Sequence, residues 1–150
     1  MQASDGVSRA FERFCGRFNA GDLDGFDAAI AADEESFVIG TQRWASGRAE
    51  WLGNYKALVD RGLVGPQGAG LRVEVSALRG FDEGSVGWAA AWVTFVFPDG
   101  TRLPTRTTSV FRNRDGDWKL LHVHFSVAVP DEIAGAHVGE WMEQLGEVVP

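Results

Sequence analysis

The spacing of apolar residues predicts helices in the first part of the chain. Over residues 7–18 apolar side chains recur every three or four positions, which indicates an amphipathic helix. Asn19-Ala20-Gly21 is suited to end this helix, and Asp22 is suited to cap a second, shorter one. The apolar side of that second helix would carry Leu23, Phe26 and Ile30.

A short strand and a third helix are predicted next. Residues 36–40 indicate the strand, and an irregular stretch containing Trp44 follows it. Ser46 or Gly47 would cap a helix from residue 48 to about residue 61, which has its own apolar stripe. The glycine-rich residues 62–70 then indicate a loop.

The second half of the chain is predicted to form an antiparallel meander. Its four strands would span residues 71–79, 85–97, 102–112 and 118–128. Turn sequences separate them at Asp82-Glu83-Gly84, Asp99-Gly100 and Asp115-Gly116. Strands this long usually bend, so we expect the sheet to curve around the helices. After Pro130, residues 131–145 predict a tail helix.

Two histidines stand at alternating positions of the last predicted strand. His122 and His124 fall in step with Trp118, Leu120 and Ser126, so all five are expected on one face of the sheet. Two-residue turns at both Asp-Gly pairs would fix the register of the neighbouring strands.

That register assembles a mixed polar and aromatic face. It places Trp92 beside Thr107 and His124, Ala90 beside Ser109 and His122, Thr94 beside Thr105 and Ser126, and Trp88 beside Phe111 and Leu120. Such a lining is typical of a pocket for a small molecule. We therefore expect this face to look toward the helices.

Length, composition and charge narrow the function classes. The 150 residues suit one domain spanning 1–150, and 45% of them are hydrophobic, as in an ordinary globular protein. The net charge of −7 argues against nucleic acid as a partner. The chain has no apolar run long enough for a membrane span and no leader pattern at Met1, so a cytoplasmic protein is expected. The single cysteine, Cys15, agrees with a reducing compartment and is expected to be a buried packing residue.

Several motifs resemble the nuclear transport factor 2-like superfamily in its SnoaL-like branch. They are the residues 19–24 that close the first helix, the stretch Phe37-Val38-Ile39-Gly40-Thr41 with Trp44 and Gly47, and the final hairpin. The hairpin, residues 110–126, is also similar to the association domain of calcium/calmodulin-dependent kinase II. The resemblance covers nearly the whole chain.

The resemblance implies an α+β fold in which a cone-shaped, curved antiparallel sheet wraps around three N-terminal helices. It also implies a homodimer that packs through the outer face of the sheet. It does not specify a function, because this fold hosts isomerases, dehydratases, cyclases, hydrolases and non-catalytic oligomerisation modules. The ketosteroid isomerase branch uses a tyrosine on the first helix, whereas this chain has phenylalanines there and a single tyrosine, Tyr55.

Two functions remain open from the sequence. In the first, the protein is an enzyme that transfers protons on a small apolar substrate without a cofactor, with His124 and His122 as the catalytic pair. In the second, it is a non-catalytic module for ligand binding or oligomerisation, and the histidines only hold the sheet together. The residues expected to contact a ligand are Thr41, Trp44, Trp88, Trp92, Thr107, Ser109 and Ser126. A metal site is not expected, because no third ligand follows the His-x-His pair.

Overall fold

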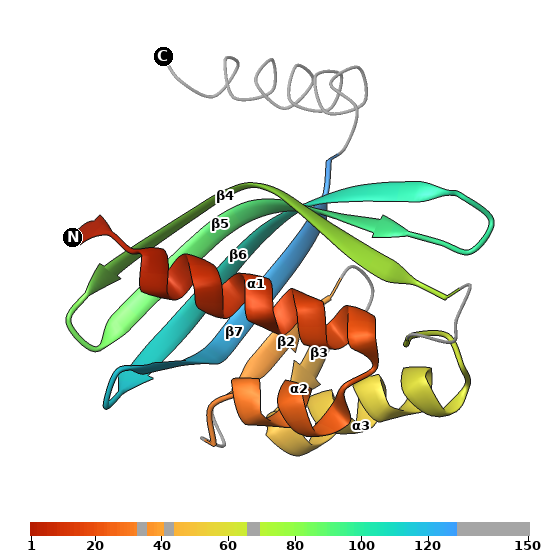
Figure 1. Ribbon diagram of the computed structural model, residues 1–150, viewed down its shortest axis with the longest axis horizontal. Coiled ribbons are helices and arrows are strands. Elements are labelled where there is room, and N and C mark those ends of the chain that lie inside the picture. Colours follow the sequence, from red (N-terminus) through yellow and green to blue (C-terminus); the bar gives the residue numbers. More distant parts are fainter. Residues whose placement is uncertain (33–35, 41–43, 66–69, 129–150) are drawn as a thin grey trace, which may run out of the picture.

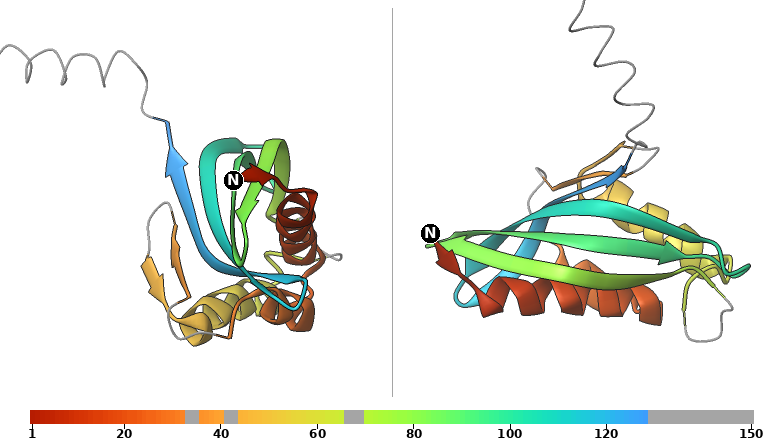
Figure 2. Two further views of the ribbon diagram at one scale, coloured as in Figure 1. Left: turned by 90° about the vertical axis from the view of Figure 1, so that its left-hand side faces the viewer. Right: turned by 90° about the horizontal axis from the view of Figure 1, so that it is seen from above.

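The computed structural model describes residues 1–32, 36–40, 44–65 and 70–128. Within these ranges, three helices lie on one face of a single seven-stranded sheet (Figure 1). No described element covers the other face of the sheet, which we call the outer face (Figure 2). The predicted tail helix, residues 131–145, lies outside the described residues. The α+β class and the curved sheet around N-terminal helices are confirmed.

The three helices form where the apolar spacing predicted them. Helix α1 (Asp5–Ala20) begins at Ser4, whose side chain accepts a hydrogen bond from the Val7 amide. It ends at Gly21, which has a φ of 68° that glycine adopts without strain. Asp22 caps α2 (Leu23–Ala29) by accepting from the Gly25 amide, and α3 (Arg48–Asp60) begins after Gly47.

The sheet combines the predicted meander with three short strands. Its strands are β1 (Gln2–Ala3), β2 (Phe37–Ile39), β3 (Trp44–Ser46), β4 (Arg72–Glu83), β5 (Val86–Val96), β6 (Arg102–Arg114) and β7 (Asp117–Val127). Their order is β1-β4-β5-β6-β7-β2-β3. One pairing differs from the predicted antiparallel sheet, because β2 runs parallel to β7. Strand β3 was expected to be irregular; instead Trp44 pairs with Ile39.

The long central strands bend around α1 (Figure 2). In β4 the pairing with β5 shifts between Ser76 and Arg79, and Ala77 takes a φ of 51°. A bulge of this kind bends a strand and increases its twist. The bend lets the sheet form a concave face that holds the buried sides of the helices.

The loop between β5 and β6 is longer than predicted. The structure pairs Trp92 with Arg106, whereas the two-residue turn at Asp99-Gly100 would have paired it with Thr107. Pro98 explains the difference, because it lacks an amide hydrogen and its fixed φ suits the first corner of a turn. Phe97 therefore pairs with Thr101 around a three-residue loop that ends at Gly100, with a φ of 85°. The predicted register of these two strands was wrong by one residue.

A bulge in β7 changes the register between β6 and β7. The two-residue turn at Asp115-Gly116 is present, with φ values of 55° and 87°, and Phe111 pairs with Leu120 as predicted. The next pair is Val110 with His122, so Leu121 is an extra residue on β7. Beyond Leu121 the side chains exchange faces. Val123 and Phe125 point toward the helices, and the predicted inward direction of the histidines was wrong.

The core lies between the helices and the concave face of the sheet. Its fully buried side chains include Val7, Phe11, Phe26, Val93, Phe111, Leu120 and Val123. The apolar positions predicted for α1 are buried, Cys15 among them, except Phe18, which is half-buried. No helix within the described residues combines the length and the hydropathy needed to cross a bilayer.

Candidate binding cavity

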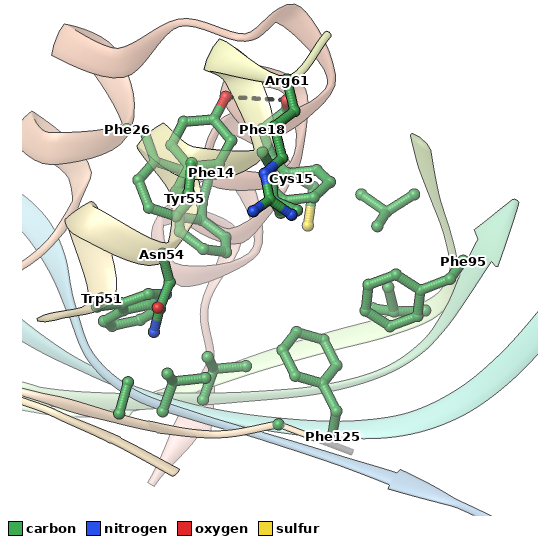
Figure 3. Close-up of a pocket in the computed structure, with 18 residues that line it drawn as sticks. Phe14, Cys15, Phe18, Phe26, Trp51, Asn54, Tyr55, Arg61, Phe95 and Phe125 are labelled. Carbon is green, nitrogen blue, oxygen red and sulfur yellow. Dashed lines mark hydrogen bonds between the residues drawn. The ribbon is translucent and has the colours of Figure 1, made fainter. Parts of the chain in front are cut away.

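A hollow of about 530 Å³ lies between the three helices and the sheet, and we call it the helix–sheet cavity (Figure 3). Its walls come from α1, α2 and α3 on one side and from the sheet on the other. Seven aromatic side chains line it: Phe14, Phe18, Phe26, Trp51, Tyr55, Phe95 and Phe125. The cavity is therefore mainly an aromatic and aliphatic surface.

The aromatic side chains on the helices pack around Phe26. Its ring stacks on Tyr55, with 3.9 Å between the ring centroids, and lies 4.9 Å from the ring of Phe14. The ring of Trp51 meets it edge-on at 6.2 Å. These contacts join all three helices, because Phe14 is on α1, Phe26 on α2 and both remaining rings on α3. The helical wall of the cavity is thus one packed aromatic cluster.

The sheet supplies the opposite wall. Val73, Val93 and Val123 form its buried part, and Phe95 and Phe125 extend it with ring centroids 5.4 Å apart in an edge-on arrangement. Val123 and Phe125 reach this wall because the bulge at Leu121 turns them inward. A flat apolar molecule would thus meet aromatic side chains on both sides.

Tyr55 has no proton to offer to a ligand. Its hydroxyl donates to the carbonyl oxygens of Arg17 and Phe18, at 2.9 and 3.0 Å, at the end of α1. Burial, followed by the negative charge of Asp22, raises the pKa of Tyr55 to about 12. The phenol therefore stays neutral at pH 7 and holds α3 against α1.

Cys15 is a second lining residue that keeps its proton. Burial, and to a smaller extent the charge of Glu12, raises the pKa of the Cys15 thiol to about 12. The thiolate is the nucleophilic form of cysteine, so a thiol held neutral is a poor nucleophile. Cys15 thus contributes a soft apolar surface to the cavity rather than a reactive group.

Two polar side chains on α3 complete the lining. Asn54 lies in the middle of α3 and Arg61 directly follows its last residue, and both line the cavity (Figure 3). Arg61 is the residue that caps the C-terminal end of α3. Among the described lining residues, Arg61 is the one charged side chain, and none is a carboxylate or an imidazole.

The two histidines predicted as catalytic lie on the outer face. His122 and His124 pair with Val110 and Thr108 on β6, and neither is among the described residues that line the cavity. The cause is the extra residue Leu121, which reverses the expected alternation along β7. The placement on which their predicted catalytic role depended was therefore wrong.

His122 links β7 to the parallel strand β2. Its Nδ1 lies 3.1 Å from the carbonyl oxygen of Phe37, and because a carbonyl can only accept, Nδ1 carries the proton. The imidazole also stacks on the ring of Phe37 at 4.1 Å. Burial lowers the pKa of His122, the Phe37 carbonyl opposes that shift, and His124 adds to it. His122 is thus neutral at pH 7 and bridges two strands, while His124 is exposed.

The predicted ligand contacts are divided between the two faces of the sheet. Trp88, Trp92 and Ser126 point to the outer face, where Trp88 stacks on Phe81. Thr107 and Ser109 do point inward and are buried, but they lie in the core beside the cavity rather than in its lining. Thr41 lies outside the described residues, as does the side chain of Trp44.

Ser109 and Thr105 show how differently two buried hydroxyls of β6 are satisfied. The Thr105 hydroxyl donates to the carbonyl oxygen of Val93 at 2.7 Å. The Ser109 hydroxyl is buried and has no hydrogen-bond partner among the residues that the structure describes. Such a group normally has a partner, and here it lies among apolar core side chains. It does not reach the cavity, so we assign it no role there.

Sequence reasoning missed most of the cavity lining. The aromatic residues of α1 and α2 were predicted only as the apolar sides of two helices, and Asn54 and Arg61 were not singled out. The available signal was on the third helix, where both polar residues stand in step with the apolar stripe that includes Trp51 and Leu58. The described residues contain no group of three or more His, Cys, Asp or Glu side chains that could hold a metal ion.

Known structures share this fold. A putative calcium/calmodulin-dependent protein kinase type II association domain from Thiobacillus denitrificans is 20% identical, with a TM-score of 0.66 over 80% of this chain and 93% of that one. A putative dehydratase of the NTF2-like family from Streptomyces avermitilis is 16% identical, with a TM-score of 0.69 over 83% and 95%. An NTF2-like protein of unknown function from Pseudomonas putida is also 16% identical, with a TM-score of 0.69 over 85% and 87%.

These similarities confirm the nuclear transport factor 2-like fold. No curated protein matches the sequence. The SnoaL-like domain family matches residues 7–130, which include α2, α3, all but the first two residues of α1, and the whole sheet except β1. The chain therefore belongs to the SnoaL-like domain family.

Proposed function

We propose that this SnoaL-like protein binds a small, flat and largely apolar molecule in the helix–sheet cavity. The observation that carries the proposal is the lining, in which seven aromatic side chains surround a hollow of about 530 Å³. Volumes of roughly 300–1,000 Å³ with mainly apolar walls and few polar groups are typical of small-molecule sites. Aromatic side chains on both walls favour a planar ligand, since rings stack or meet edge to face.

Binding is favoured over proton-transfer catalysis in this cavity. The titratable groups among its described lining residues are Cys15, Tyr55 and Arg61. The first two have pKa values raised to about 12, and a guanidinium does not lose its proton in proteins. A general base must work near the ambient pH, and none of these three does. The putative dehydratase among the similar structures therefore supports the fold here and not the reaction.

A bulky side chain on α3 is expected to block the cavity. Leu58 lines it and is half-buried, so Leu58→Trp should place an indole in the space that a ligand needs. We expect the Kd of the neutral fluorescent probe N-phenyl-1-naphthylamine to rise at least about tenfold. This corresponds to a loss of roughly 1.4 kcal/mol of binding free energy. Fluorescence titration of both proteins measures the effect, and native mass spectrometry checks for a ligand that copurifies.

The matched control is Leu52→Trp on the same helix. Leu52 is also half-buried and packs against the core, but it does not line the cavity. This variant should bind the probe as the unaltered protein does. Equal weakening by both variants would mean that the probe reports on helix stability, and no binding by any of the proteins would refute the proposed function.

We also propose that a second copy of the chain packs on the outer face of the sheet, as the family resemblance implies. In support, the outer face exposes 42% of Trp92, and it carries Val86 with 45% exposed at one end of β5. Trp88 and Val110 add apolar surface between them. Large apolar side chains exposed side by side are typical of a protein interface.

Replacing Trp92 by glutamate is expected to separate the two copies. A carboxylate in an apolar interface loses its hydration, and the one cross-strand cation, Arg106, offsets only part of that cost. Light scattering after size-exclusion chromatography should give a mass of twice 16.3 kDa for the unaltered chain and 16.3 kDa for Trp92→Glu. Leu63→Glu, at a similarly exposed apolar residue that follows α3, should leave the mass unchanged. A monomeric unaltered protein would contradict the proposal.

A further inference from the structure

The side of α3 that faces the cavity carries two polar side chains among apolar ones. Trp51, Asn54, Leu58 and Arg61 follow one another at intervals of three or four residues, so they share one side of the helix. In Figure 3 the Arg61 side chain extends toward the interior on the side of Cys15, and the amide of Asn54 lies next to Trp51. Seven residues separate the two polar positions, which is about 10 Å along a helix axis.

Arg61 has no partner within the described part of the chain, as is also true of Arg9, Arg13 and Arg79, and of these four arginines it is the one that lines the cavity. Arg48 pairs with Asp27, Arg72 and Arg102 pair with Glu74, and Arg17 donates to the Gly25 carbonyl. Among the described residues, none makes a hydrogen bond or an ion pair with the guanidinium of Arg61, and none makes a hydrogen bond with the amide of Asn54. Both groups therefore remain available to a molecule that enters the cavity.

The other residues that line the cavity determine which net charge a bound ligand can carry. Cys15 and Tyr55 are neutral, and the other described lining residues are apolar apart from Asn54 and Arg61. An anion that enters such a cavity loses water and needs a cation to compensate. A guanidinium compensates for the lost hydration, because it forms a pair of parallel hydrogen bonds with an oxyanion. A single arginine suits a single negative charge.

Building on the proposed function, we propose that the cavity selects a monoanionic ligand. The ligand has a flat apolar body that lies between the aromatic walls, and a carboxylate-type oxyanion that binds Arg61 at the rim. A neutral polar group elsewhere on the ligand would meet the amide of Asn54. The aromatic walls provide most of the affinity, and Arg61 provides the preference for charge.

Two fluorescent probes with the same body test this preference. 8-Anilinonaphthalene-1-sulfonate carries one oxyanion, and N-phenyl-1-naphthylamine is the same ring system without it. We expect the unaltered protein to bind the sulfonate more tightly, and Arg61→Gln to weaken sulfonate binding about fivefold, since an exposed ion pair contributes up to roughly 1 kcal/mol. The same variant should bind the neutral probe unchanged.

Arg13→Gln is the matched control. Arg13 is exposed on α1, it does not line the cavity, and its replacement changes the net charge by the same amount. This variant should keep the affinity for both probes. If Arg61→Gln weakens both probes equally, or lowers thermal stability without changing their affinity ratio, Arg61 serves only the end of α3 and the inference is wrong.

The two proposals fail in different ways. If neither probe binds, or if Leu58→Trp leaves the affinity for both unchanged, the proposed function itself is wrong. If both probes bind, Leu58→Trp excludes both, and the unaltered protein holds the neutral one at least as tightly, the cavity binds ligands but does not select an anion. Only the further inference is then overturned.

Discussion

Replacing Phe26 by alanine is expected to lower the free energy of unfolding by about 4 kcal/mol, within the range for a buried phenylalanine. Phe26 is 2% exposed, and its ring contacts those of Phe14, Trp51 and Tyr55. Alanine would remove the group that joins α2 to both other helices. Since α2 has seven residues and is too short to be stable alone, its position depends on this contact. Urea unfolding followed by circular dichroism measures the change.

Phe97→Ala provides the comparison. Phe97 is 37% exposed near the turn between β5 and β6, so its loss should cost less than about 1 kcal/mol. A loss below about 1.5 kcal/mol for Phe26→Ala, or equal losses for the two variants, would show that the aromatic cluster does not hold the helices together. The urea dependence of the free energy should be similar in all three proteins if unfolding stays two-state.

Cys15 is expected to react with iodoacetamide on the order of a thousandfold more slowly in the folded protein than in the unfolded chain at pH 8. Its pKa is raised from 9.0 to about 12, and below both values the thiolate fraction falls tenfold for each unit. Mass spectrometry of alkylated protein over time, in buffer and in denaturant, measures the two rates. The chain has one cysteine, so the signal has a single source.

A control for this rate places the thiol at the surface. In a Cys15→Ala background, Ser85→Cys introduces an exposed thiol in the turn before β5, which should react at nearly the same rate folded and unfolded. Fast alkylation of Cys15 in the folded protein would contradict its burial beside the cavity.

The same pKa shifts predict the direction of the stability change in alkali. The folded pKa of Cys15 and of Tyr55 lies above the ordinary values of 9.0 and 10.0, so the unfolded chain loses these protons first. Their contribution to stability is full below pH 9 and is lost as the pH rises toward 12. Cys15→Ala should therefore reduce the loss of stability over this range, as measured by urea unfolding at a series of pH values.

The sequence predicted the fold well because each element has a local signal. Ser4 and Asp22 cap helices, Gly21 ends one, and Asp115-Gly116 forms a hairpin turn, each for a reason that depends only on neighbouring residues. The short strands β1 and β3 have too few residues to show a period. The parallel pairing of β2 with β7 joins residues far apart in the chain, so no local pattern could indicate it.

The candidate site was harder to predict, because the direction of a side chain on a strand depends on every residue before it. The loop at Pro98 could have been predicted, since a proline cannot donate to the pair that a two-residue turn requires. The extra residue Leu121 has no comparable signal, because leucine is ordinary in a strand. That one residue moves His122 and His124 to the outer face and brings Val123 and Phe125 to the cavity.

The cavity lining differs in burial between the sheet and α3, and this difference affects how related proteins could acquire new ligands. The inner part of the sheet wall, formed by Val73, Val93 and Val123, belongs to the buried core, so most changes there endanger folding. On α3, Asn54, Ala57 and Arg61 are exposed at the rim and contribute little to the core. Substitutions at these positions can change which ligands bind while the fold stays stable. A new specificity can therefore arise from a few substitutions at positions three or four residues apart.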